Sequence, residues 1–346
     1  MTRESRNAAN WLLASLALLA LLVVGRPFLV PLVFTVLISA VLNAIVDLLL
    51  RLKLPRWFAW LATMAVLVGA IYLVTRIVAG QAADFAIEAP NYVANLERVV
   101  TQLLAPLRLG IAIQDMFSRS DIAGILTNVA TTLGASALGI IQVLIYVGFL
   151  LTEQDALSAK VARLLATGDG HEETRGVLRT IVRQVQSYLG VCTILSAIMA
   201  ATSYTLLVML DVQYAAFWSL LIFILTYIPT IGAAAVVIPA LMALVQFGTI
   251  ATPLIIIVVL GAIHFVLMNI AATLILGQSL NLSPFAIILA LTFWGLVWGI
   301  AGLFLAVPLT AAIAIICAHI DELKWASLLL AAPPPRARKK RRPIVP

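Results

Sequence analysis

Charged residues are scarce in this chain of 346 residues. Only 11% of the residues are Asp, Glu, Lys or Arg, whereas 63% are hydrophobic and the mean hydropathy is +1.11. Soluble domains carry about 25% charged residues, which cover the water-exposed surface. The 109 residues from 212 to 320 contain none of the four charged types. A soluble enzyme, a nucleic-acid-binding domain and a disulfide-rich secreted protein are therefore excluded. The composition predicts an all-α polytopic membrane protein.

Cysteine and the common catalytic patterns are scarce as well. Cys192 and Cys317 stand far apart inside apolar segments, so they predict no disulfide. No Gly-Lys pair occurs in the chain, which excludes the P-loop of an ATP-driven pump. His171-Glu172 lacks the second histidine of a zinc protease, and the run 134–139 lacks the spacing of a nucleophile elbow. We therefore expect no enzyme activity, no cofactor and no metal site.

Apolar stretches of the length that crosses a bilayer as a helix, about 20 residues, occur six times. They lie at about 8–25, 28–50, 57–79, 134–151, 189–210 and 251–276. Amphipathic helical patterns fill the two long loops, with interruptions at Pro90 and Pro106 in one and at Gly168–Gly170 in the other. The expected segments are 1–79, three spans forming a candidate scaffold; 80–133, an outer amphipathic loop; 134–151, the fourth span; 152–188, cytoplasmic amphipathic helices; 189–320, the transport core; and 321–346, a basic tail.

The positions of Lys and Arg predict the orientation, because these residues concentrate on the cytoplasmic side. They collect before the first span, at 51–56, at 160–183 and in the tail. This pattern places both termini in the cytoplasm and the segment 80–133 outside. Six of the 22 basic residues stand between 336 and 342. Such a run is attracted to anionic lipid, which we expect as its partner in preference to nucleic acid.

Two apolar stretches are too interrupted to be single spans. The first, 215–247, breaks at Tyr227–Gly232, and the second, 285–319, breaks at Gly299–Gly302. Each half has about 15 residues, or roughly 22 Å of helix, which is short of a bilayer core about 30 Å thick. The halves form either re-entrant hairpins or tilted pairs of full crossings. A proline follows each break, Pro239 and Pro308, which suggests an internal repeat.

Paired segments of this kind point to the binding site of a transporter, because irregular backbone at membrane depth must line protein or a wet cavity. His264 is the strongly titratable side chain nearest the middle of a span, and it either relays protons or only bonds a neighbouring helix. The candidate break residues are Pro229, Gly232, Gly299, Gly302 and Pro308. The candidate solute contacts are Thr226, Tyr227, Thr230, His264, Asn269, Gln278, Asn281 and Ser283.

The C-terminal runs 277–285 and 291–310 resemble the signature of the autoinducer-2 exporter (AI-2E) family. Tyr227–Gly232 followed by Ile238-Pro239-Ala240 resembles the second landmark of that family, and Leu54-Pro55-Arg56 also fits. The resemblance covers essentially the whole chain. It implies a multi-pass transporter of the bacterial inner membrane and a homo-oligomer, with a pentamer as the suggested form. It also implies export of the signalling molecule autoinducer-2 (AI-2) or, in other relatives, sodium/proton exchange.

The chain departs from the family pattern at one place. Relatives commonly carry Asn-x-Leu-Glu-Pro-Arg, and Asn269 keeps the first position, whereas Glu, Pro and Arg are replaced by residues 272–274, Ala-Thr-Leu. Where relatives usually carry Arg after the next glycine, this chain has Gln278. Where they commonly carry Gln five residues before the Asn, it has His264. A charged pair inside a membrane marks an ion or substrate pathway, so its absence weakens the case for ion coupling and for the substrates assigned to relatives.

We therefore expect about six spanning helices plus two broken or re-entrant hairpins, in a secondary transporter or facilitator for a small polar solute. AI-2-like export is one form of this function. The alternatives are a sodium/proton-type exchanger and a non-transporting membrane scaffold that binds a partner.

Overall fold

The computed structural model describes residues 3–104, 141–153, 156–157, 160, 171–229, 231–276 and 282–332. Throughout these residues the regular structure is helical, apart from one isolated bridge between Leu282 and Ala331. Within them, five helices are long and apolar enough to cross a membrane. The prediction of an all-helical polytopic membrane protein is confirmed. Other predicted segments, including 105–133 and the basic run, lie outside the described residues.

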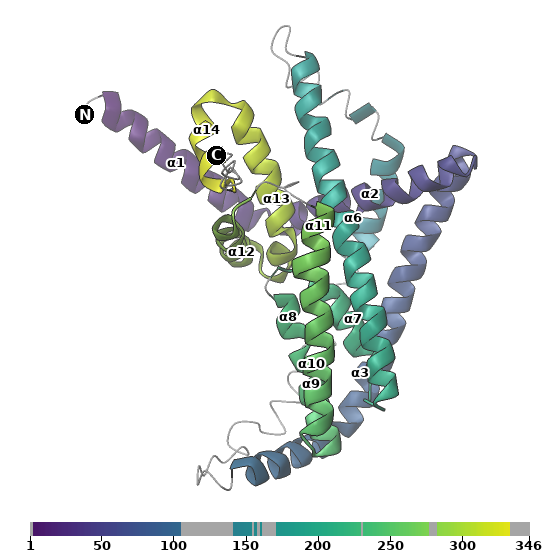
Figure 1. The fold of residues 1–346 in the computed structure, drawn as a ribbon. Coiled ribbons are helices and arrows are strands. Elements are labelled where there is room, and N and C mark those ends of the chain that lie inside the picture. The colour runs from purple at the N-terminus through teal and green to yellow at the C-terminus, as the bar shows by residue number, and fades with distance from the viewer. Residues whose placement is uncertain are drawn as a thin grey trace, which may run out of the picture.

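Three helices open the chain: α1 (Arg3–Val24), α2 (Arg26–Arg51) and α3 (Arg56–Leu104). The turn before α3 places Lys53 at φ 62°. Helix α3 has 49 residues and continues through Pro90, so the predicted interruption there was wrong. A proline kinks a helix without ending it when the surrounding contacts hold both sides. The C-terminal part of α3 indeed turns away from its first part (Figure 1).

The far end of α3 is tied to the turn between α6 (His171–Met209) and α7 (Ala215–Thr226) by polar side chains. The Tyr92 hydroxyl lies within hydrogen-bond distance of a Glu88 carboxylate oxygen and of the Gln213 amide oxygen, and the Gln81 side chain accepts from the Phe217 N–H at 2.9 Å. Burial, and then the hydrogen bond with Glu88, raise the pKa of Tyr92, so this hydroxyl remains a neutral donor. The predicted outer segment is therefore attached to the helical bundle.

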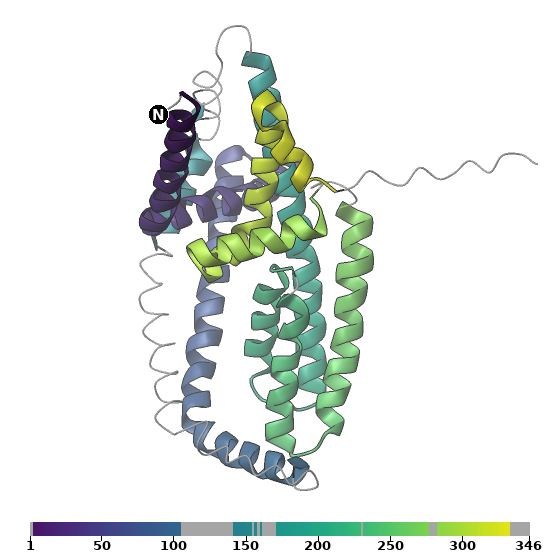
Figure 2. The ribbon, with the colours of Figure 1, turned by 90° about the vertical axis from the view of Figure 1, so that its left-hand side faces the viewer.

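Helix α6 is the central element of the bundle. Its 39 residues join the second predicted cytoplasmic amphipathic helix to the fifth predicted span without a break. It packs against α2, α7, α10 (Ala251–Phe265), α11 (Ala272–Leu276) and α13 (Ile300–His319). Helices α6 and α10 lie side by side and run in opposite directions (Figures 1 and 2).

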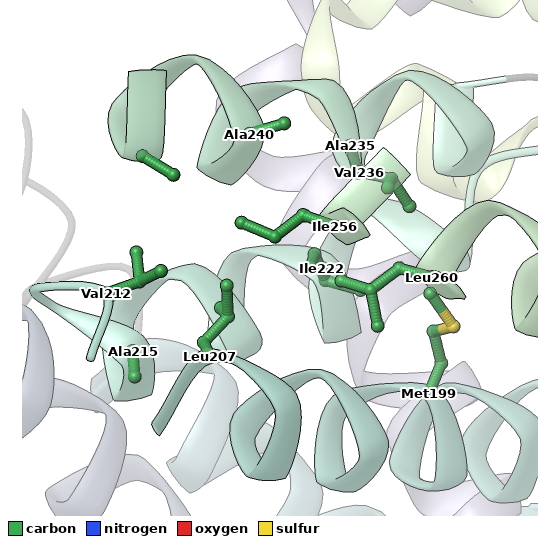
Figure 3. Packing of buried hydrophobic residues seen from close by; sticks show 11 residues of the cluster. Met199, Leu207, Val212, Ala215, Ile222, Ala235, Val236, Ala240, Ile256 and Leu260 are labelled. Atoms are coloured by element: carbon green, nitrogen blue, oxygen red, sulfur yellow. The ribbon is translucent and has the colours of Figure 1, made fainter. Parts of the chain in front are cut away.

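The first predicted break is present. Helix α7 ends at Thr226, and the chain resumes as α8 (Ile231–Ala235) and α9 (Val237–Phe247). With 12 and 11 residues, α7 and α9 are each too short to span a bilayer core about 30 Å thick at about 1.5 Å per residue. A buried apolar cluster holds these pieces against α6 and α10, with Met199, Ile222, Ala240 and Leu260 among its members (Figure 3).

The second break is narrower than predicted. Helix α12 (Pro284–Trp298) is followed by Gly299, which has φ 64° and ψ −140° and directly precedes α13. Helix α13 has 20 residues and is itself long enough to cross a membrane, so the prediction that both halves are short was wrong here. Gly302, which was predicted to be the last residue of the break, lies within the first turn of α13. Helix α12 lies across the direction of α6 and α10 (Figure 2).

Short helical pieces complete the described chain. A 3₁₀ turn (Asp321–Leu323) and α14 (Lys324–Leu330) follow α13, and α14 packs against it. Many large apolar side chains elsewhere are exposed, for example Leu296 at 83% and Leu274 at 79%. Such outward apolar surface suits a lipid environment, because lipid tails are as apolar as these side chains.

Candidate functional site

The first break is anchored at its start by buried groups. The Thr226 hydroxyl is buried and donates to the Ile222 carbonyl oxygen at 2.6 Å. Ile228 is also buried and belongs to an apolar cluster with Trp298 and Leu305 of the second broken segment. Pro229 is half-buried beside it. The turn is therefore held in place by α12 and α13, not only by its own helices.

Tyr227 links the first break to α6. Its hydroxyl lies 2.7 Å from the Thr193 hydroxyl, and Thr193 itself donates to the Leu189 carbonyl oxygen at 2.7 Å. Since Thr193 has one proton to donate, Tyr227 is the donor in this pair. The Tyr227 ring also lies 6.3 Å from the ring of Phe304 in α13, measured between centroids. One tyrosine at the break thus contacts both α6 and α13.

His264 faces the other side of the same break. A Cβ added to Gly232 would lie 2.9 Å from His264 Cε1 and 3.1 Å from Thr226 Cα. Two elements approach closely here, so a side chain at this position would force the imidazole ring to move and the Thr226 backbone to shift slightly. The Nδ1 atom of His264 is buried and has no hydrogen-bond partner among the described residues. An unpaired buried polar atom costs about 1–3 kcal/mol unless a ligand or water completes it.

A π-helix, Val266–Ala271, follows the end of α10 and begins two residues after His264. Such segments are rare and are frequent at functional sites, because the widened turn re-aims the side chains. Asn269 lies within it, is exposed, and donates from Nδ2 to the Phe265 carbonyl oxygen at 3.2 Å. The irregular helical geometry therefore begins two residues after the histidine that contacts the break.

The second break is closed by tryptophan and backbone. A Cβ on Gly302 would lie 1.8 Å from the Trp294 carbonyl oxygen. Trp294 Nε1 donates to the Thr310 hydroxyl at 3.2 Å, and Trp298 Nε1 donates to the Leu22 carbonyl oxygen at 2.9 Å. Pro308 is buried within α13. At the tip, Arg26 Nη2 would lie 3.4 Å from a Cβ on Gly299. This hairpin is packed internally and docked on α1 and α2.

The structure thus brings Thr226, Tyr227, Gly232 and His264 together at one site. Ser283 lies elsewhere, as the N-cap of α12, where its hydroxyl accepts from the Ala286 N–H at 3.1 Å and its own N–H donates to the Leu330 carbonyl oxygen at 2.8 Å. Thr230, Gln278 and Asn281 lie outside the described residues. Within the described chain, no group of three or more His, Cys, Asp and Glu residues is arranged to hold a metal ion.

Sequence reasoning missed the contribution of α6 to this site. Thr193 binds Tyr227, and it belongs to a series of small polar residues at helical spacing along α6 that includes Ser196 and Ser203, both buried. Small hydroxyl residues at such spacing in a spanning helix mark the face that packs on other helices. That pattern was a usable signal, although it does not tell which helix lies opposite.

A membrane protein built from apolar helices, one of them broken beside an unpaired histidine, has the organisation of a transporter, in which discontinuous helices form the binding site. The family model described as AI-2E family transporter matches residues 12–322. The chain belongs to the AI-2E transporter family; it is a membrane transport protein and not an enzyme.

Curated relatives cover most of the chain. The AI-2 transport protein TqsA of Escherichia coli K12 is 29% identical over 306 residues, 85% of this chain and 88% of TqsA. A putative transport protein of Haemophilus influenzae is 26% identical over 327 residues, 91% of this chain and 94% of its own. The putative transport protein YhhT of Escherichia coli K12 is 25% identical over 320 residues, 90% and 91% of the two chains.

Proposed function

We propose that this protein carries a small, uncharged polar solute such as AI-2 across the bacterial inner membrane, as a secondary transporter or facilitator. The observation that carries the proposal is the break between α7 and α8, where the buried Nδ1 of His264 has no partner among the described residues. The name of TqsA, an AI-2 transport protein, supports the choice of solute. The solute binds beside the break, with Tyr227 and His264 among its contacts.

The lack of charge favours an uncharged solute over an ion. Residues 212–320 carry no Asp, Glu, Lys or Arg, and a buried ion without an opposite charge is costly in a membrane. A sodium/proton-type exchanger is the second candidate, and its support is His264, whose imidazole is a group that can bind and release a proton. A non-transporting scaffold is the third, and it predicts no solute movement at all.

The moving part under this proposal is the group α7–α9 with α10. Bonds from Trp298 to Leu22 and the closeness of Arg26 to Gly299 attach the second hairpin to α1 and α2. That hairpin therefore belongs with the scaffold of the first helices. Helices α7 to α9 are short and separated by irregular residues, which can absorb the change of direction when the site opens to either side.

Efflux from proteoliposomes tests the function. Vesicles holding the purified protein are loaded with AI-2, and the release is measured with no ion gradient, with a sodium gradient and with a proton gradient. Release without any gradient, above protein-free vesicles, supports a facilitator. Release only with a gradient supports a coupled transporter. Solute-free sodium/proton exchange without AI-2 release would favour the exchanger, and no movement of either kind would favour the scaffold.

Orientation and assembly are part of the proposal. Both termini face the cytoplasm, as the Lys and Arg pattern predicts, and several copies assemble into an oligomer with a pentamer as the expected form. Labelling of single cysteines at residues 5 and 335 by a membrane-impermeant reagent in intact cells tests the first point, with labelling of either terminus arguing against it. Native mass spectrometry of the protein in detergent measures the number of subunits.

Anionic lipid binding at the cytoplasmic end completes the proposal. Trp325, Leu328 and Leu329 form an exposed apolar face on α14, and six basic residues follow between 336 and 342. An apolar face beside a basic run is typical of a segment that lies in the headgroup region of an anionic membrane. Replacing the six basic residues by Gln is expected to remove the preference for phosphatidylglycerol vesicles over phosphatidylcholine vesicles in co-sedimentation of a peptide covering 321–346.

A further inference from the structure

Two buried polar atoms without partners lie on the helices that flank the first break. Ser196 of α6 is fully buried, and its Oγ has no hydrogen-bond partner among the described residues. His264 Nδ1 on α10 is in the same condition. Ser203 is equally buried on α6, yet its Oγ donates to the Met199 carbonyl oxygen at 2.7 Å. A buried serine in this helix can thus donate to the backbone carbonyl four residues before it, as Ser203 does. Ser196 makes no such bond.

The packing of α6 on α10 brings residues Ser196 and His264 to a similar level along the two helices. The helices run antiparallel, and Met199 and Leu260 belong to one buried cluster (Figures 1 and 3). Ser196 lies about one turn before Met199, and His264 about one turn after Leu260, so the antiparallel register places both at one level. Thr193 lies about one turn before Ser196 on α6, and its hydroxyl is hydrogen-bonded to Tyr227 at the break. Both residues therefore border the interruption between α7 and α8.

The chemistry of the two atoms is complementary to a hydroxyl group. A serine hydroxyl donates one hydrogen bond, and the Nδ1 of a neutral imidazole accepts one when Nε2 carries the proton. A single bound hydroxyl can accept from Ser196 and donate to His264, which satisfies both. The 109 residues from 212 to 320 bring no charge to this region, so an ion would lack a counter-charge there.

We infer that Ser196 is a solute-contact residue, and that its hydroxyl and His264 Nδ1 together bind one hydroxyl group of the carried solute. This inference rests on the proposed function, and it assigns a contact that no sequence motif indicates. Ser196 acts by direct hydrogen bonding, so its removal weakens solute binding and leaves the packing of α6 nearly unchanged, because Ser→Ala deletes one buried atom whose hydrogen-bond potential is otherwise unmet.

The first test is a matched pair of substitutions on one helix. Ser196→Ala and Ser203→Ala both remove a buried hydroxyl from α6, and only the first is expected to change transport. We expect Ser196→Ala to raise the KM for AI-2 efflux about tenfold, the effect of losing roughly 1.4 kcal/mol of binding, while Ser203→Ala stays within about twofold. Elution profile and melting temperature of both variants check the fold. Equal KM values in the two variants would overturn the inference.

The second test does not depend on transport. In a chain with Cys192→Ala and Cys317→Ala, we expect Ser196→Cys to react with a small methanethiosulfonate reagent and AI-2 to slow that reaction. Ser203→Cys is expected to show no labelling above the background of the cysteine-free parent. Protection by AI-2 in a protein that gives no efflux would uphold the contact and refute transport. Reaction that AI-2 leaves unchanged indicates a site for water alone, and the absence of reaction indicates a dry contact; either result refutes the inference.

Discussion

The two broken segments share a pattern of glycine and proline, but they differ in what surrounds the break. At the first, helix ends meet a half-buried tyrosine and an imidazole with an unpaired nitrogen. At the second, Trp294 and Trp298 fill the space, and both indole N–H groups are hydrogen-bonded. The first interruption therefore leaves one buried nitrogen without a hydrogen-bond partner among the described residues, whereas both indole N–H groups at the second have partners. Similar interruptions in one chain thus differ in whether their buried polar atoms find partners, and the one with an unpaired atom is the proposed binding site.

The space around Gly232 in the first break and Gly302 in the second shows the same contrast. The obstacle at Gly302 is the Trp294 carbonyl oxygen, 1.8 Å from an added Cβ, whereas at Gly232 it is His264 Cε1 at 2.9 Å. A backbone carbonyl moves only if two helices separate, but an imidazole can rotate about its side-chain torsions. At the second break the nearest obstacle is therefore backbone, whereas at the first break it is a side chain that can change its rotamer.

The largest expected effect is at the closed hairpin. Gly302→Ala should destabilise the folded protein by roughly 3 kcal/mol or more, because the methyl group forces α12 away from α13. The measurement is the melting temperature and the yield of monodisperse protein in detergent. Gly261→Ala in α10 is the control, since nothing lies within 4 Å of its added Cβ. Wild-type melting behaviour of Gly302→Ala would contradict the close packing.

A smaller loss of stability and a larger loss of function are expected at the first break. Gly232→Ala displaces the His264 ring, so we expect AI-2 efflux to fall by about tenfold or more, as losing roughly 1.4 kcal/mol of binding implies. The melting temperature should fall less than for Gly302→Ala. Adding His264→Ala removes the collision with the ring, so the double variant should regain stability without regaining transport. A double variant as unstable as Gly232→Ala alone would argue against that contact.

Removing one hydrogen bond from the closed hairpin should affect stability alone. Trp294→Phe leaves the Thr310 hydroxyl without its indole donor, which we expect to cost about 1–3 kcal/mol. Thr310→Val, which removes the other partner, is the matched variant. Efflux per folded molecule should match wild type in both, because this hairpin holds no solute in the proposed mechanism. Reduced efflux with unchanged melting would place a solute contact here.

The smallest stability effect is expected at Tyr227. Tyr227→Phe removes the bond to Thr193, whose own proton still reaches the Leu189 carbonyl oxygen, so the cost should be about 1 kcal/mol or less. A double-mutant cycle with Thr193→Val isolates the coupling energy of the pair. Efflux should fall further than stability, which distinguishes this break from the closed hairpin. An effect on stability alone would assign Tyr227 a structural role.

Much of the fold followed from local sequence features. Hydropathy predicted the helical membrane architecture, and glycine with proline predicted both interruptions, because helix length and helix breaking depend on neighbours in sequence. The interruption at Pro90 and the short second half after Gly299 were wrong. In each case packing against another helix outweighed a local tendency: α3 is tied to the α6–α7 turn, and α13 packs along the preceding helix α12.

The candidate site was predictable only in part. Thr226, Tyr227, Gly232 and His264 were recognised as break or polar residues, and the structure brings them together. Ser283 was recognised by the same criterion and is instead a helix cap. Thr193 and Ser196 escaped notice because hydroxyl residues are common in spanning helices, and their position opposite the break depends on how α6 packs.

The amino-acid sequence by itself determined that this protein lives in lipid, that it is helical, and where its helices are interrupted, since each of these follows from the hydropathy and backbone freedom of neighbouring residues. Only the tertiary structure decided which interruption keeps unpaired polar atoms. That choice depends on side chains from α6 and α10 for one break, and from α1, α2 and the two tryptophans for the other, and these residues meet only when the helices pack.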